Sequence, residues 1–185
     1  MAVPVPLWAS LSPAEKRART LEVANELFAR EGLDLPMPKL ADAIGVGVGS
    51  IYRQVGPKHE LIAALVIERS AILRARFLAA LDRPDPWEAL TAATHATVDD
   101  CINDALSQTA WDEAAFTSES VRRARNGATE ALAALVERAR AADALRDDAT
   151  HEDLRLAFCA LRELGGIGPD PAHRLAELVL RGMRK

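Results

Sequence analysis

Apolar residues recur three and four positions apart along nearly the whole chain, which is the spacing of one face of an α-helix. Between residues 12 and 32, for example, Ala18, Leu21, Ala24 and Phe28 follow this spacing. No run of residues alternates convincingly between apolar and polar side chains, as a half-buried strand requires. The pattern therefore predicts an all-α fold of about nine helices.

Capping and breaking residues divide this pattern into separate helices. Ser12-Pro13-Ala14-Glu15 is a capping box with proline at the first helical position, and Gly32 ends the helix that follows. Gly56-Pro57 opens a long helix, and Arg83-Pro84-Asp85-Pro86 is the clearest break after residue 60. Other helices are predicted over 39–44, 48–54, 87–107, 119–142, 151–164 and 171–183, whereas residues 111–116 are ambiguous.

The length and composition are those of an ordinary globular protein. The 185 residues allow one domain or two small ones, and 49% of them are hydrophobic. No apolar run approaches the length of a membrane-spanning helix, and the N-terminus lacks a signal-peptide pattern, so a soluble cytoplasmic protein is expected. Cys101 and Cys159 lie in helical patterns without CxxC spacing, which favours buried, reduced thiols over a disulfide.

The net charge of −4 opposes binding to nucleic acid, but it is unevenly distributed. Residues 1–60 contain seven Lys or Arg and seven Asp or Glu, so this part is neutral. Residues 61–185 contain 16 basic and 20 acidic residues and carry the whole deficit. The placement of the few cations in the first 60 residues therefore matters more than the total charge.

The stretch AIGVGVGSIYRQV, residues 43–55, has the glycine content of a phosphate-binding loop. It completes neither a GxGxxG fingerprint nor a Walker sequence, because Ser50 or Tyr52 stands where the third glycine is needed and no lysine follows before Lys58. A helical pattern precedes it, whereas both motifs follow a strand. A nucleotide-binding loop is therefore not expected.

Two short helices joined by a tight turn account better for this stretch. Gly45 lies where a helix commonly ends in left-handed geometry, and Ile51 and Val55, four residues apart, face inward together. The outward side of the second helix then carries Gly49, Ser50, Tyr52 and Arg53. This is the arrangement of a helix-turn-helix, whose second helix enters the major groove of DNA.

A set of residues between positions 20 and 65 also matches a family pattern in order and spacing. They are Ala24, Leu27, Phe28, Gly32, Leu40, Ala41, Gly45, Val46, Gly49, Ser50, Ile51, Tyr52, Lys58 and Leu61. This segment resembles the DNA-binding region of TetR-type (TetR/AcrR) transcriptional regulators. The resemblance implies a DNA-binding domain over residues 1–56 and a ligand-binding and dimerisation domain over residues 57–185.

The resemblance and the chemistry of the side chains together predict which residues contact DNA. The Ser50 hydroxyl can reach a base edge or a phosphate, and Tyr52 is similar to the family's phosphate-binding tyrosine. The fork of Arg53 can grip guanine, and Lys58 begins a helix whose free N–H groups favour a phosphate. The predicted set is Lys39, Val48, Gly49, Ser50, Tyr52, Arg53 and Lys58. An ordinary solvated or structural role is the alternative for each.

The chemistry of the C-terminal part is sparse. Its histidines form no HExxH or similar pattern, and no Ser-His-Asp or paired-carboxylate arrangement follows from spacing. The sequence therefore predicts no catalytic set, no metal site and no cofactor. The resemblance implies a pocket for a small-molecule effector, and the residues predicted to line it are Trp87, His95, Cys101, Trp111 and Phe116. Ordinary core positions account for these five residues equally well.

The helices at 151–164 and 171–183 have apolar faces long enough to need a partner, and the resemblance implies that they pair with a second copy as a four-helix bundle. The leading hypothesis is a homodimeric repressor that binds a palindromic operator in double-stranded DNA and is released by its effector. A helical adaptor that lost DNA binding is one alternative, favoured by Pro38, Gly47 and Val55, where the family usually has threonine, serine and an aromatic residue. An all-helical enzyme is the other alternative.

Overall fold

The computed structural model describes residues 8–103, 118–163 and 168–185. Within these ranges the chain has eight α-helices, one 3-10 turn (Trp8–Ser10) and a single isolated bridge between Leu145 and Arg184. The predicted all-α fold class is confirmed, with eight described helices against about nine expected. The ambiguous segment 111–116 and the end of the helix predicted over 87–107 lie outside the described residues. None of the described helices is long and apolar enough to cross a bilayer.

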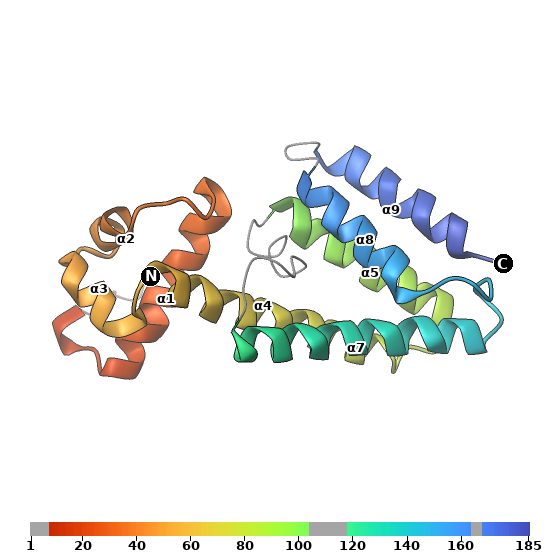
Figure 1. The fold of residues 1–185 in the computed structure, drawn as a ribbon, viewed down its shortest axis with the longest axis horizontal. Helices are drawn as coiled ribbons and strands as arrows, with labels where there is room; N and C mark the ends of the chain where they lie inside the picture. Colours follow the sequence, from red (N-terminus) through yellow and green to blue (C-terminus); the bar gives the residue numbers. More distant parts are fainter. Residues whose placement is uncertain (1–7, 104–117, 164–167) are drawn as a thin grey trace, which may run out of the picture. The chain divides into compact units, whose positions relative to one another are not determined.

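The chain divides into two compact units, Met1–Leu65 and Val66–Lys185, with the boundary inside helix α4 (Lys58–Ala80). The first unit contains α1 (Pro13–Glu31), α2 (Met37–Ile44), α3 (Val48–Val55) and the first turns of α4 (Figure 1). Among its described residues, the second contains the rest of α4 and four further helices.

Local sequence signals determine both ends of α1. The Glu15 N–H donates to Ser12 Oγ at 3.3 Å, and the Ser12 N–H donates to the Glu15 carboxylate at 2.7 Å, which completes the predicted capping box. Hydrogen bonds from the Ser12 side chain and backbone hold the pKa of the Glu15 carboxyl below its ordinary value. Gly32 ends the helix as predicted, and its N–H donates to the Phe28 carbonyl.

A small core holds the helices of the first unit together. α1 packs against α2 and α3, and α2 packs against α3. Each helix contributes buried apolar side chains, and burying a Val, Leu, Ile, Phe or Met side chain stabilises a fold by about 1.5–3 kcal/mol. These side chains are Val23, Ala24, Leu27, Phe28, Met37, Leu40, Ala41, Ile51, Val55, Leu61 and Leu65.

The second unit is a helical bundle around α5 (Pro86–Asn103), which packs against α7 (Glu119–Ala141), α8 (His151–Glu163) and α9 (Pro169–Met183) (Figure 1). Asp85 caps α5 by accepting hydrogen bonds from the N–H groups of Trp87 and Glu88, so the predicted break before this helix is confirmed. The last helix begins at Pro169, two residues before the predicted start, because Gly168 rather than Asp170 occupies its N-cap position.

Candidate nucleic-acid interface

The turn between α2 and α3 is made by residues 45–47. Gly45 adopts the left-handed conformation (φ 79°, ψ 35°), and its N–H donates to the carbonyls of Ala41 and Asp42. The Val46 N–H donates to the Ala41 carbonyl at 3.0 Å, which completes the helix end. A short turn of this kind, closed by a left-handed glycine, is typical of a helix-turn-helix. The predicted conformation of Gly45 is confirmed.

The two faces of α3 are separated as the sequence predicts. Ile51 and Val55 are buried against the other helices of the first unit. Val48, Gly49 and Arg53 are exposed on the opposite side. Tyr52 is the most open of the apolar residues on this helix, with 47% of its surface exposed. The outward face of α3 therefore presents a small residue in its first turn and an aromatic and a cationic side chain beyond it.

Packing within the chain does not require a glycine at position 49. A Cβ atom there would meet only Arg53 Nη1, at 3.9 Å, which is an ordinary van der Waals separation. Arg53 Nη2 in turn donates to Ser50 Oγ at 3.0 Å, across one turn of the helix. This bond uses one of the guanidinium's five N–H donors and leaves the others available to a partner.

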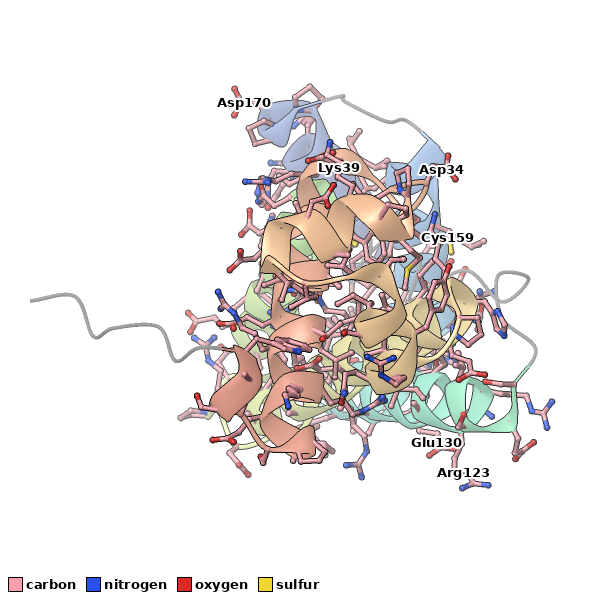
Figure 2. All side chains as sticks on the ribbon, turned by 90° about the vertical axis from the view of Figure 1, so that its left-hand side faces the viewer. Asp34, Lys39, Arg123, Glu130, Cys159 and Asp170 are labelled. Carbon is pink, nitrogen blue, oxygen red and sulfur yellow. The ribbon has the colours of Figure 1, made fainter. Side chains whose placement is uncertain are left out.

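The basic side chains near α3 differ in how they are engaged. Lys39, on α2 (Figure 2), pairs with the Glu31 carboxylate, so a contact with phosphate requires this pair to open. Arg17 Nη1 donates to the Gln54 carbonyl at 2.7 Å and joins α1 to the end of α3. Lys58 lies half-buried in the first turn of α4, and no carboxylate of the described residues forms an ion pair with it.

Three of the residues predicted to line an effector pocket, Trp87, His95 and Cys101, lie on α5. Trp87 stacks under the Arg184 guanidinium, 4.9 Å from its ring centroid. Cys101 is buried on the same helix, α5. His95 is engaged with residues of α9. Trp111 and Phe116 lie outside the described residues, so the prediction of a common pocket is untested.

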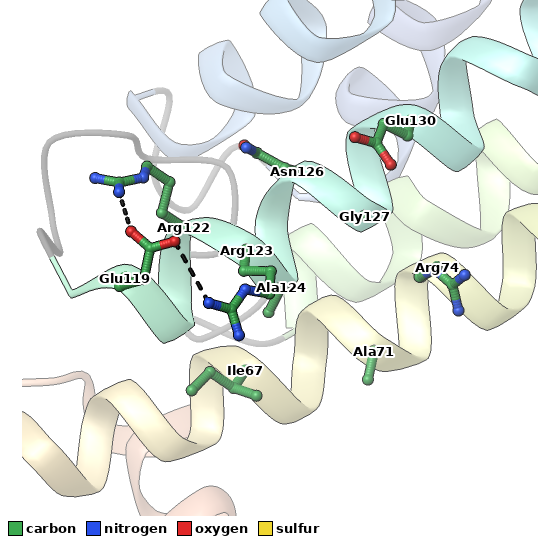
Figure 3. A pocket seen from close by; sticks show the side chains of 10 residues that line it. All are labelled: Ile67, Ala71, Arg74, Glu119, Arg122, Arg123, Ala124, Asn126, Gly127 and Glu130. Atoms are coloured by element: carbon green, nitrogen blue, oxygen red, sulfur yellow. Dashed lines mark hydrogen bonds and ion pairs between the residues drawn. The ribbon is translucent and has the colours of Figure 1, made fainter.

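A groove of about 470 Å³ lies between α4 and α7, and Trp87, His95 and Cys101 are not among its lining residues (Figure 3). Arg122 and Arg123, on its α7 wall, both pair with Glu119. The full lining is Ile67, Ala71, Arg74, Glu119, Arg122, Arg123, Ala124, Asn126, Gly127 and Glu130. The sequence did not predict this groove, because charged residues on an exposed helix are usually just solvated.

Two histidines distant in the sequence meet between α5 and α9. His95 Nδ1 lies 2.9 Å from His173 Nδ1, His95 Nε2 lies 2.9 Å from Glu177 Oε1, and His173 Nε2 lies 2.8 Å from Asp99 Oδ1. The sequence signal is a histidine followed four residues later by a carboxylate, once on each helix. Spacing alone does not reveal that these two faces meet. Over the described ranges, no group of three or more His, Cys, Asp or Glu side chains is arranged to hold a metal ion.

Two sequence profiles match the chain. The profile described as bacterial regulatory proteins of the tetR family matches residues 21–65. The profile described as the C-terminal domain of SbtR-like transcriptional regulators matches residues 85–185, more than half of the chain. No curated protein matches the sequence.

Several solved structures are similar over nearly the whole chain. The TetR transcriptional regulator SCO0520 from Streptomyces coelicolor is 30% identical, with a TM-score of 0.65 over 91% of this chain and 98% of that one. The TetR transcription regulatory protein from Mycobacterium vanbaalenii is 26% identical, with a TM-score of 0.64 over 97% and 100%. AibR, in complex with isovaleryl coenzyme A and operator DNA, is 15% identical and shares the fold, with a TM-score of 0.69 over 90% and 97%.

Proposed function

Because this chain belongs to the TetR family of bacterial transcriptional regulators, we propose that it is a cytoplasmic repressor that binds a palindromic operator as a homodimer. Residues 1–56 form the proposed DNA-binding domain, and residues 57–185 form the proposed ligand-binding and dimerisation domain. The protein acts by binding rather than by catalysis. The observation that carries this proposal is the outward face of α3.

The α3 face has the shape and chemistry of a helix that enters the major groove. Gly49 keeps its first turn small, although glycine within a helix costs about 1 kcal/mol and packing within the chain does not require it. A close approach by an outside partner explains this choice of residue. Ser50 and Arg53 then offer a hydroxyl and a planar fork to base edges.

Backbone phosphates are the proposed partners of the remaining polar groups. The exposed Tyr52 hydroxyl can donate to a phosphate oxygen, and Lys58 combines its ammonium with the N-terminus of α4. Lys39 joins them once it leaves Glu31. These contacts position the helix and supply salt-dependent affinity, whereas Ser50 and Arg53 supply the sequence preference.

A second copy of the chain is the proposed partner of α8 and α9. These helices pack against each other, and each exposes a large leucine: Leu156 is 60% exposed and Leu178 is 53% exposed. Burying both leucines of each chain in a four-helix bundle removes this apolar surface from water. The dimer also gives two recognition helices, which read major grooves about 34 Å apart.

The proposed effector is a small molecule that binds within residues 57–185 and favours a dimer unable to hold the operator. AibR binds both isovaleryl coenzyme A and operator DNA, which supports two ligands on one chain of this fold. Trp87, His95, Cys101, Trp111 and Phe116 remain the proposed lining residues. The α4–α7 groove lies in the same part of the chain.

A mobility-shift experiment with the DNA beside the protein's own gene tests the proposal. The wild type is expected to shift this DNA at low salt, whereas Arg53→Ala weakens binding by about 1–3 kcal/mol and loses sequence preference. Tyr52→Phe, which removes only a hydroxyl, weakens binding by about 1 kcal/mol. Arg83→Ala, at an exposed arginine of the second unit before α5, is the matched control and leaves binding unchanged. A folded wild type that shifts no DNA would contradict the repressor proposal and favour the adaptor alternative.

A further inference from the structure

The hydrogen bonds around His95 and His173 depend on how many protons the two rings hold. An ionised carboxylate only accepts hydrogen bonds, so each Nε2 must carry a hydrogen that it donates to Glu177 or to Asp99. The two Nδ1 atoms lie 2.9 Å apart, and a hydrogen bond between them needs a proton on one of them and not on the other. All three contacts are hydrogen bonds at the same time only when the four ring nitrogens hold three protons, which gives the two rings together one positive charge.

We propose that a hydrogen-bonded cluster, here called the clasp, holds α9 against α5 and that its closure depends on protonation. The clasp consists of His95, Asp99, His173 and Glu177. When the two rings hold only two protons in total, at least one contact is lost. Either the two Nδ1 atoms present lone pairs to each other, or one carboxylate has no ring N–H from which to accept a hydrogen bond. With four protons, two N–H groups face each other and both rings are charged. The clasp is closed only with three protons, and acid opens it more strongly than base, because only acid adds charge repulsion.

Charged groups also lie on the helices that pack around the pair. On α9, Arg181 Nε lies 3.5 Å from the free oxygen of Glu177. On α5, Asp100 is held by Arg76 of α4, at 2.7 Å, and on α8, Glu152 pairs with Arg155. Both carboxylates lie within hydrogen-bond distance of a ring nitrogen, and Arg181 adds a positive charge beside Glu177.

The position of the clasp connects it to the proposed dimer, and this connection rests on the proposed function. Leu178 follows Glu177 directly on α9 and belongs to the face proposed to contact the second copy. Opening the clasp frees the half of α9 that contains His173 from its polar contacts with α5. Acidification is therefore expected to weaken the dimer and, through it, binding to the operator.

Nuclear magnetic resonance of the full chain with ¹⁵N-labelled histidine tests the clasp directly, between about pH 5 and about pH 8, where an ordinary histidine changes charge. His95 and His173 are expected to titrate in two linked steps. His95→Asn is expected to change the titration curve of His173. The control His151→Asn, which removes a histidine beside Glu152 on α8, leaves that curve as it is. An unchanged His173 curve in His95→Asn overturns the proposal.

A double-mutant cycle of His95→Asn and His173→Asn, measured by urea unfolding, gives a second test. The coupling is expected to be about fivefold in the unfolding equilibrium constant when the clasp is closed, the size of one net hydrogen bond, and to fall towards onefold in acid. Coupling that does not change with pH contradicts the clasp. Sedimentation at the same pH values distinguishes the clasp from its proposed effect on the dimer. If the two histidines titrate together while the dimer stays unchanged, the clasp is supported and its connection to DNA binding is contradicted.

Discussion

At the scale of single residues, a substitution at Gly49 is expected to change the stability of the fold and the proposed DNA binding in opposite directions. Gly49→Ala is expected to stabilise the first unit by about 0.5–1 kcal/mol, because alanine favours the helix and the added Cβ meets nothing closer than 3.9 Å. The same methyl group is expected to weaken DNA binding by holding α3 away from the groove. Urea unfolding and mobility shifts on the same preparations measure both effects. A variant that is more stable and binds DNA as well as the wild type would remove Gly49 from the interface.

Lys58 and Lys39 are both predicted phosphate contacts, but Lys39 must first break its ion pair with Glu31. Lys58→Ala is expected to weaken binding on all sequences and to reduce the slope of log K against log salt by about one unit. Lys39→Ala is expected to change the slope less, because the Lys39 ammonium already pairs with Glu31. Titrations at several salt concentrations test this order. An equal or larger effect at Lys39 would show that its pair with Glu31 opens at no cost.

At the scale of elements, the turn between α2 and α3 depends on one backbone conformation. Gly45→Ala is expected to destabilise the first unit by about 1 kcal/mol, because an L-residue is strained at φ 79° although the space around the site is open. Gly45→Asn is the matched control and is expected to lose less, since asparagine tolerates the left-handed region. Urea unfolding measures both variants. Equal losses would mean that the side chain, rather than the backbone, determines the effect.

The helix ends were predictable from the sequence because they depend on near neighbours. Ser12, Gly32, Gly45 and Asp85 act within four residues of their own positions, through caps and turns. The start of α9 was predicted two residues late, because Pro171 is a strong local signal and Gly168 a weak one.

The meeting of helix faces was not predictable in the same way. The two faces of α3 follow from periodicity, because the apolar side must be the buried side. The contact of His95 with His173 joins positions 78 residues apart, and it depends on how α5 and α9 pack. The groove between α4 and α7 likewise depends on where two helices separate, and periodicity within each helix carries no information about this.

At the scale of the whole molecule, the acidic balance of residues 61–185 means that the proposed affinity for DNA must come from the small neutral domain, which the proposed dimer presents twice. A single copy presents few cations to the phosphates. Pairing two copies roughly doubles the counterions released and fixes both recognition helices on one operator. Any change that separates the copies should therefore reduce DNA binding without altering a residue at the interface with DNA.

The double variant Leu156→Glu with Leu178→Glu makes this argument testable. Two carboxylates on each chain would face their counterparts across the proposed bundle, so the dimer is expected to dissociate and operator binding to fall at least tenfold, by about 1.4 kcal/mol or more. Leu78→Glu, at a leucine of α4 that is 38% exposed, is the matched control and should leave the dimer intact. Sedimentation reports the assembly state directly, since the chain has a mass of 20.0 kDa. A wild type that sediments as a single chain at micromolar concentration, yet binds its operator tightly, would show that one copy suffices for recognition.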